Sequence, residues 1–325
     1  MSDPAPPPVP ARDAATIMLV RDADDAGGPA LEVCMLRRHL DSDFVGGAYV
    51  FPGGKVDAED RGAAAEAASA ARGDAEASAL LGVASGGLAF WVAALRECFE
   101  EAGVLLAYDA GSSGGSSPGR TLGIDDAARR ELAAMRRACN AGEVAFLDAC
   151  RRAGLLLATD QVHYFSHWIT PEAAPKRYDT RFFVAALPPG QVPVHDDRET
   201  VDTVWVRPAD ALARARAGEF DLIFPTMKNL EAIGRFTTSA ELLAAAAAIE
   251  RVPTVLPRVV VDERGFRILL PGDPGYEEAV GGGGPTPGAG RPMTPAEMGA
   301  VIRSIDGDGR SQRSAPAGTG GDVPG

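Results

Sequence analysis

The chain has 325 residues, 46% of them hydrophobic, and its 32 basic and 45 acidic side chains leave a formal net charge of −13. This length and composition are sufficient for a large buried core. The acidic balance, without any Lys- or Arg-rich run, argues against binding of extended nucleic acid, whereas a small anionic substrate bridged by a metal ion remains compatible.

Features of targeting and membrane insertion are missing from the sequence. No stretch approaches the roughly 18 consecutive apolar residues of a membrane span. The first ten residues hold five prolines where a signal peptide needs an apolar core. The last residues, Asp322 to Gly325, do not form a peroxisomal address. We therefore expect a cytoplasmic protein that does not bind membranes.

Both ends of the chain have the composition of disordered segments. Residues 1–11 are rich in proline, and residues 281–325 contain 13 Gly and 6 Pro. A short amphipathic helix, Thr294 to Ile305, is predicted inside the second tail. Between the tails we expect one folded domain over residues 12–280.

Strands and helices alternate along this domain. Apolar periodicity predicts three strands, at Thr16–Val20, Leu31–Leu36 and Ala48–Phe51, followed by a helix over Leu88–Glu101. A Gly/Ser loop follows at Gly111–Gly119. The later predicted elements are one or two helices in Asp125–Ala153, strands Gln161–Ile169, Phe182–Leu187 and Thr203–Val206, helices Pro208–Ala217, Thr226–Phe236 and Ser239–Glu250, and a hairpin of Val259–Asp262 with Phe266–Leu270. This order predicts an α/β fold with a mixed sheet between helices.

Three carboxylates lie on one face of the predicted helix within Arg96–Val104. At about 100° per residue, Glu97, Glu100 and Glu101 share an arc of roughly 100°. Crowded carboxylates raise each other's pKa, so keeping all three ionised requires a strong positive partner such as Mg²⁺ or Mn²⁺. The alternative is an exposed acidic surface on which Arg96 pairs with Glu100.

A glycine turn precedes this helix in the chain. The predicted strand ending at Phe51 runs into Gly53 and Gly54, which let the backbone approach a ligand closely and expose a carbonyl.

Together the two stretches resemble the Nudix hydrolase box, which runs Gly, five residues, Glu, seven residues, then Arg-Glu-U-x-Glu-Glu-x-Gly-U, where U is apolar. Arg96–Val104 matches every fixed position of the second half, and Gly54 fits the opening glycine. Asp60 stands where the box has Glu, and the segment between Asp60 and Arg96 is 28 residues longer than usual. Such an insertion, about residues 61–87, resembles the branch that contains the acyl-coenzyme A diphosphatase of animal peroxisomes.

The resemblance implies a Nudix α/β/α sandwich and a role for each box residue. Glu97, Glu100 and Glu101 would coordinate Mg²⁺ or Mn²⁺, the carbonyl of Gly54 would add a ligand, and one carboxylate would accept the proton of the attacking water. Arg96 would act as a structural brace. Its expected partner is Asp60, or Glu59 if the register slips by one.

Nudix enzymes often take a further carboxylate from a remote loop, and here the candidate is Glu199. Asp196, Asp197 and Asp202 compete for this role, and a solvated turn is the plain alternative.

Several basic residues and the insertion leave alternatives open. Arg177 and Arg181 are candidates for contact with substrate phosphates or a base, and a structural role at a strand edge is equally compatible. Four arginines of the Asp125–Ala153 segment are interpreted as a solvated surface in preference to a phosphate clamp, namely Arg129, Arg130, Arg136 and Arg137. The insertion is interpreted as a surface helix and loop, with substrate gating as the alternative.

The resemblance implies a metal-dependent hydrolase that cleaves a nucleoside diphosphate linked to another group. Coenzyme A or acyl-coenzyme A is the favoured substrate, giving 3′,5′-ADP and a 4′-phosphopantetheine. ADP-ribose, a dinucleotide such as NADH or a damaged nucleotide are competing substrates. Two alternatives belong to other functional classes. One is a non-catalytic module that senses nucleotides, although the intact box glutamates argue against it. The other is a structural or interaction protein. Homodimerisation, frequent among Nudix proteins, is a possible assembly.

Overall fold

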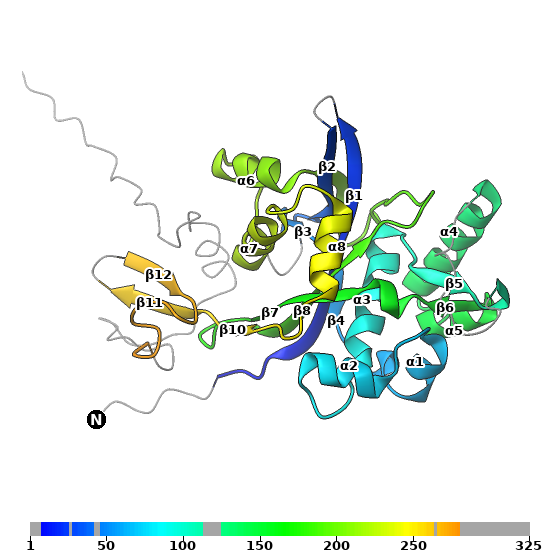
Figure 1. Ribbon diagram of the computed structural model, residues 1–325, viewed down its shortest axis with the longest axis horizontal. Helices are drawn as coiled ribbons and strands as arrows, with labels where there is room; N and C mark the ends of the chain where they lie inside the picture. The colour runs from blue at the N-terminus through cyan, green and yellow to red at the C-terminus, as the bar shows by residue number, and fades with distance from the viewer. Residues whose placement is uncertain (1–7, 26–27, 42–45, 113–124, 263–264, 280–325) are drawn as a thin grey trace, which may run out of the picture.

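The computed structural model describes residues 8–25, 28–41, 46–112, 125–262 and 265–279 (Figure 1). Most of the predicted tails therefore lies outside the described residues, as does the predicted helix Thr294–Ile305. The predicted Gly/Ser loop also lies mostly outside them, and the limits of the domain remain a prediction.

Within the described residues, eight strands form one mixed sheet. They are β1 (Arg12–Asp25), β2 (Gly28–Arg38), β3 (Tyr49–Val50), β4 (Gly53–Lys55), β7 (His163–Ile169), β8 (Tyr178–Ala186), β9 (Thr200–Val206) and β10 (Thr254–Val255). The order is β10-β7-β8-β1-β2-β3, with β4 also paired to β1 and β9 to β2. β1 runs parallel to β8, and β10 parallel to β7, whereas the other pairs are antiparallel.

Alternating residues of β1 show how helices cover both faces of the sheet. Ile17 and Leu19 are fully buried in the cluster that contains the long helix α3 (Leu88–Ala102). Met18 and Val20 point the other way, into a second buried cluster. That cluster is formed with the helices α6 (Pro208–Arg216), α7 (Phe224–Ile233) and α8 (Ser239–Ala247). The predicted sandwich of a mixed sheet between helices is confirmed (Figure 1).

Smaller elements flank the sandwich. Beside α3 lie α1 (Ala63–Ala68), α2 (Asp74–Leu81), α4 (Asp126–Asn140), α5 (Phe146–Arg152), and the two-stranded pair β5 (Ala107–Asp109) and β6 (Leu155–Leu157), with the short 3-10 turns η1 (Ala58–Asp60), η2 (Ala110–Ser112) and η3 (Thr159–Gln161). The predicted carboxy-terminal hairpin is present as β11 (Arg258–Asp262) and β12 (Gly265–Leu269). The strands β4, β5, β6 and β10 were not predicted, because two or three residues are too few to show a periodicity.

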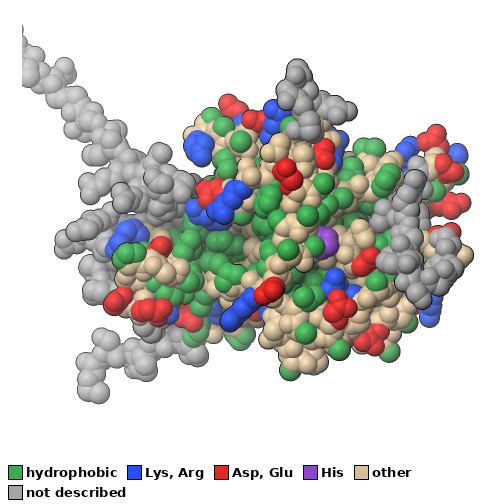
Figure 2. Space-filling view, in the orientation of Figure 1, with side chains coloured by type: hydrophobic (Ala, Val, Ile, Leu, Met, Phe, Trp, Pro, Cys, Tyr) green, Lys and Arg blue, Asp and Glu red, His purple; other side chains and the backbone are tan. Residues whose placement is uncertain are grey.

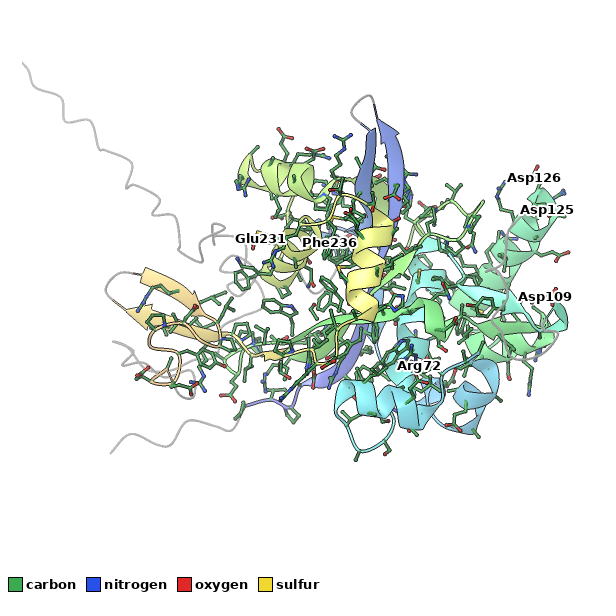
Figure 3. The ribbon with its side chains drawn as sticks, in the orientation of Figure 1. Arg72, Asp109, Asp125, Asp126, Glu231 and Phe236 are labelled. Carbon is green, nitrogen blue, oxygen red and sulfur yellow. The ribbon has the colours of Figure 1, made fainter. Side chains whose placement is uncertain are left out.

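The insertion forms α1 and α2 and is attached to the helix α3 side of the fold. Ala70 N–H donates to the carbonyl of Leu157 (2.9 Å), and Arg72 Nε donates to the carbonyl of Thr159 (3.3 Å). The Arg72 guanidinium also lies 5.0 Å from the ring centre of Trp91 in α3 (Figure 3). The insertion is thus a packed part of the domain and not a free loop.

No helix in the described part of the chain has both the length and the apolar character needed to cross a membrane.

Candidate active site

The carboxylates are carried by α3, whose two ends are held by residues outside the helix. At its start, Leu88 N–H donates to Asp74 Oδ1 of the insertion (3.0 Å). At its end, Gly103 adopts the left-handed conformation (φ 68°) that commonly terminates a helix. This explains the glycine at that place in the box.

Arg96 is bound to Asp60 at two points. Its Nε lies 2.9 Å from Asp60 Oδ1 and its Nη2 lies 3.0 Å from Asp60 Oδ2, and Nη2 also donates to the carbonyl of Lys55. Asp60 is 1% exposed, and its carboxylate also accepts the N–H of Asp57 (2.8 Å), which fixes the turn η1. The structure therefore places Asp60, and not the exposed Glu59, beside Arg96.

The three box glutamates are brought together next to β4. Glu97 and Glu100 each accept from Arg96 Nη1, at 2.9 and 3.1 Å. Glu101 is buried, and its Oε2 accepts the N–H of Gly53 (2.9 Å). It therefore points toward β4 and does not lie on an exposed helix face.

Gly54 is positioned where no side chain fits. A Cβ at this residue would lie 2.3 Å from Glu97 Oε1. The glycine is therefore required by the close approach of the Glu97 carboxylate to the backbone.

Burial controls the electrostatics of the three glutamates. It raises the pKa of Glu97 to about 7, with Arg96 opposing the rise and the charges of Glu100 and Glu199 adding to it. It also raises the pKa of Glu100, against the effect of Arg96. For Glu101, burial and the neighbouring Glu97 raise the pKa well above its ordinary value. A cluster of buried and partly buried carboxylates that resists ionisation gains from a divalent cation.

These residues have the chemistry for a hard cation, but their side chains are not already converged on one point. No group of three or more His, Cys, Asp or Glu side chains among the described residues forms a ready-made metal site. Glu97 and Glu100 are turned toward Arg96, and Glu101 toward Gly53. Metal binding would therefore require some of these carboxylates to turn from their present partners.

Glu199 reaches this region through strand pairing. Arg38 of β2 pairs with Thr200 of β9, and His39 N–H donates to the carbonyl of Glu199 (2.9 Å). Glu199 is exposed and lines the same cavity as Glu97 and Glu100. The Asp196 carboxylate instead accepts the N–H groups of Glu199 and Thr200, which shapes the turn.

A cavity of about 900 Å³ adjoins the glutamates. Its basic lining residues are Arg38, His39, Lys55, Arg96, Lys176 and Arg198. The chain has three lysines in all, and two of them line this cavity. The lining also holds five carboxylates, Asp41, Asp57, Glu97, Glu100 and Glu199, so a divalent cation bound to the glutamates would leave a net positive surface for an anionic ligand.

Arg38 was missed by the sequence reasoning. It lines the cavity, and its Nε is buried without a hydrogen-bond partner among the described residues. The basic run Arg37-Arg38-His39, just after a predicted strand, could have indicated a phosphate-binding residue. The place of Arg38 in the cavity, however, depends on the pairing of β2 with β9.

Arg177 and Arg181 are placed elsewhere. Arg177 is buried and donates to the carbonyls of Thr170 (3.1 Å) and Val9 (2.7 Å). Arg181 is buried, forms an ion pair with Asp179 and lies over the ring of Phe90. Neither side chain lines the cavity, so the structure does not bring them to the glutamates.

Arg136 was interpreted from the sequence as part of a solvated surface, which was wrong. Its Nε and Nη2 donate to the carbonyls of Glu100 (3.0 Å) and Glu101 (2.7 Å), and Asn140 Nδ2 donates to the same Glu100 carbonyl (3.1 Å). Arg198, beside Glu199, donates to the Asn140 carbonyl. Helix α4 thus ties the end of α3 to the loop that carries Glu199.

The insertion contributes no residue to the cavity lining. Its hydrogen bonds include those of Asp74 with α3, Ala70 with β6 and Arg72 with η3. The structure thus gives no support to the gating alternative.

Comparisons with known proteins agree with this geometry. A family model described as the NUDT19 Nudix domain matches residues 64–233. The protein named acyl-coenzyme A diphosphatase NUDT19 from Gallus gallus is 29% identical over 304 residues, covering 82% of this chain and 80% of its own length. Its Homo sapiens namesake is 29% identical over 274 residues, covering 75% and 72%. A crystal structure of a NUDIX hydrolase from Alicyclobacillus acidocaldarius aligns with a TM-score of 0.53 and 25% identity, covering 72% of this chain and 96% of that chain.

Proposed function

Because this chain belongs to the NUDT19 family of Nudix hydrolases, we propose that it is a coenzyme A and acyl-coenzyme A diphosphatase. The products would be 3′,5′-ADP and a 4′-phosphopantetheine or its acyl derivative. The observation that carries the proposal is that Glu101 accepts the N–H of Gly53 and Glu97 lies against Gly54, next to a cavity that Glu97 and Glu100 line together with Arg38 and Lys55. The names of the relatives support the choice of substrate.

The proposed cofactor is Mg²⁺ or Mn²⁺, held by Glu97, Glu100 and Glu101 with the carbonyl of Gly54. When bound, such an ion neutralises charge on the phosphate oxygens and lowers the pKa of a water molecule. Oxygen ligands of this kind suit both ions.

The chain's own residues would divide the remaining work. Glu97 or Glu199, which both line the cavity, would accept the proton of the attacking water. Arg38 and Lys55 line the cavity and would contact phosphate oxygens. Asp60 accepts hydrogen bonds from Arg96, and Arg96 in turn donates to Glu97 and Glu100. The Asp60–Arg96 ion pair would therefore position these two glutamates.

The test is turnover by the purified chain with Mg²⁺ or Mn²⁺. A panel of coenzyme A, acetyl-coenzyme A, ADP-ribose, NADH and nucleoside triphosphates is incubated, and the products are identified by mass. Release of 3′,5′-ADP from the coenzyme A compounds is expected, with Glu100→Gln losing about 10²-fold or more in rate. Preferred turnover of another substrate would contradict the proposed specificity. No turnover of any compound, with Glu100→Gln identical to wild type, would remove the hydrolase proposal.

A further inference from the structure

The cavity extends well beyond the glutamates and changes character along its length. At the glutamate end it is lined by charged groups that include Arg38, Lys55 and Glu199. The opposite part, here called the distal pocket, is lined mainly by Trp168, Thr180, Ile223, Phe224, Val259 and Ile268. Figure 2 shows hydrophobic side chains gathered between the β11–β12 hairpin and helix α7. A single ligand that fills the cavity must therefore have a charged part and a largely neutral part.

One face of the sheet forms the floor that connects the two parts. Lys55 of β4 pairs with Ala14 of β1, Ala14 pairs with Thr180 of β8, and Thr180 pairs with Trp168 of β7. All four residues line the cavity. Three steps between strands separate Lys55 from Trp168, which is about 14 Å. The residues between them, Ala14 and Thr180, are small enough to leave a channel along the floor.

The roof of the distal pocket comes from parts of the chain far from the box. Ile223 and Phe224 lie at the start of α7, and Val259 and Ile268 lie on the β11–β12 hairpin. The Phe224 ring packs edge-on against Trp168, with 5.9 Å between the ring centres. The carboxy-terminal hairpin therefore has a definite place in the site.

We propose that the distal pocket binds the pantetheine arm and a short acyl group, with the nucleotide directed toward Arg38. This inference rests on the proposed function. A pantetheine arm carries no charge, and its chain from phosphate oxygen to sulfur contains 12 bonds. At about 3.5 Å for every three extended bonds, it spans about 14 Å, which matches the floor from Lys55 to Trp168. Thr170, Thr180 and Thr226 line the cavity and supply hydroxyls for its two amides.

The opposite orientation would place the adenine in the distal pocket. Its basis is Lys176, which also lines the cavity and would then bind the 3′-phosphate. Charge argues against it, because the ADP group carries most of the ligand's negative charge and most of the lining cations lie outside the distal pocket. The two orientations can be distinguished by substitutions that narrow the distal pocket. Such substitutions should weaken acyl-coenzyme A binding in the first orientation and 3′,5′-ADP binding in the second.

The experiment narrows the distal pocket from the floor with Thr180→Leu and from the roof with Val259→Trp. Both variants are assayed with coenzyme A and with acetyl-, butanoyl- and hexanoyl-coenzyme A. The inhibition constant of 3′,5′-ADP, which lacks the pantetheine arm, is measured alongside. Thr16→Leu makes the same change on the floor beside Gly53 and serves as the matched control. Thermal melting identifies any variant that fails to fold, in which case the other distal variant decides.

The expected result is an increase in KM of about tenfold or more for the acyl compounds in both distal variants, with the inhibition constant of 3′,5′-ADP within about twofold of wild type. In the wild type, each added methylene that enters the pocket should strengthen binding by about fourfold. Thr16→Leu should weaken all ligands together.

Two outcomes would overturn the inference while leaving the diphosphatase proposal intact. One is unchanged KM in both distal variants. The other is a loss of 3′,5′-ADP binding in the distal variants as large as that of the acyl compounds, which would place the nucleotide in the distal pocket. If the wild type turns over no coenzyme A compound, both proposals fail.

Discussion

Asp60 and Arg96 are joined by two hydrogen bonds, of 2.9 and 3.0 Å, in a part of the protein where both side chains are buried. The same guanidinium holds Glu97 and Glu100. Asp60 is one methylene shorter than the usual box residue, and the turn η1 brings it within reach. The positions of Glu97 and Glu100 are therefore linked to this ion pair.

Replacing Asp60 with alanine should be strongly destabilising. It leaves Arg96 buried without its main partner, which typically costs about 3–5 kcal/mol. Urea unfolding would measure the loss, and kcat should fall with it. The control is Glu59→Ala, which removes an exposed neighbour and should change stability by less than about 0.5 kcal/mol. Equal effects of the two substitutions would contradict the assignment.

Gly54→Ala should reduce activity far more than stability. The new Cβ would overlap the end of the Glu97 side chain, which can swing away but then leaves its position beside the backbone. We expect a loss in kcat of about 10²-fold with a melting temperature near that of wild type. Gly73→Ala is the matched control, because a Cβ there meets no atom within 4 Å. Wild-type activity in Gly54→Ala would show that the close approach is not needed.

The metal-free protein should lose stability as pH rises, in a way that depends on Glu97. Its pKa is raised from 4.5 to about 7 in the folded state, so the folded protein binds the proton more tightly than the unfolded chain. The resulting stabilisation is complete below pH 4.5 and is lost as pH rises through about 7. With EDTA present, wild type should therefore lose stability relative to Glu97→Gln between pH 5 and pH 8.

Adding Mg²⁺ or Mn²⁺ at pH 8 should stabilise the wild-type protein. The gain should be about 2.7 kcal/mol when the free ion concentration is 100 times its dissociation constant. Thermal melting over the pH series measures both effects. Parallel curves for wild type and Glu97→Gln would show that Glu97 does not titrate in this range.

Arg136→Ala should lower kcat with a smaller change in KM. The guanidinium holds the carbonyls of Glu100 and Glu101, so its loss frees the end of the helix that carries the glutamates. We expect a decrease of about tenfold or more in kcat and a destabilisation of about 2 kcal/mol. Arg137→Ala, on the exposed face of the same helix, should behave like wild type. A change in KM alone would instead indicate direct contact with substrate.

Asp74→Ala tests the contribution of the insertion. Asp74 accepts the N–H groups of Gly86 (2.8 Å) and Leu88 (3.0 Å), and the Gly86 bond is the main reason that its pKa is lowered. Asp74→Ala should lower the free energy of unfolding by about 1–2 kcal/mol at pH 7. In the wild type, the stabilisation by Asp74 should be lost as pH falls through its lowered pKa, because the carboxylate becomes protonated. Asp126→Ala, which removes an exposed pair with Arg129 (Figure 3), should change stability by less than about 0.5 kcal/mol. Unfolding at pH 7 and at pH 3 would compare the two.

The sequence by itself was sufficient for features that depend on neighbouring residues. Glu97, Glu100 and Glu101 share one turn of α3, and a helical turn has the same geometry in any fold. The closing Gly103 follows from local backbone conformation in the same way.

Contacts between distant segments were decided only by the tertiary structure. Glu199 lines the same cavity as Glu97 and Glu100 because β9 pairs with β2. Arg136 is turned inward by the packing of α4, and the distal pocket forms where a sheet face meets a hairpin from the end of the domain. Arg177 and Arg181 have the same charge as Arg38, yet only Arg38 lines the cavity. A side chain's type determines what it can bind, but strand pairing and helix packing determine what it lies beside.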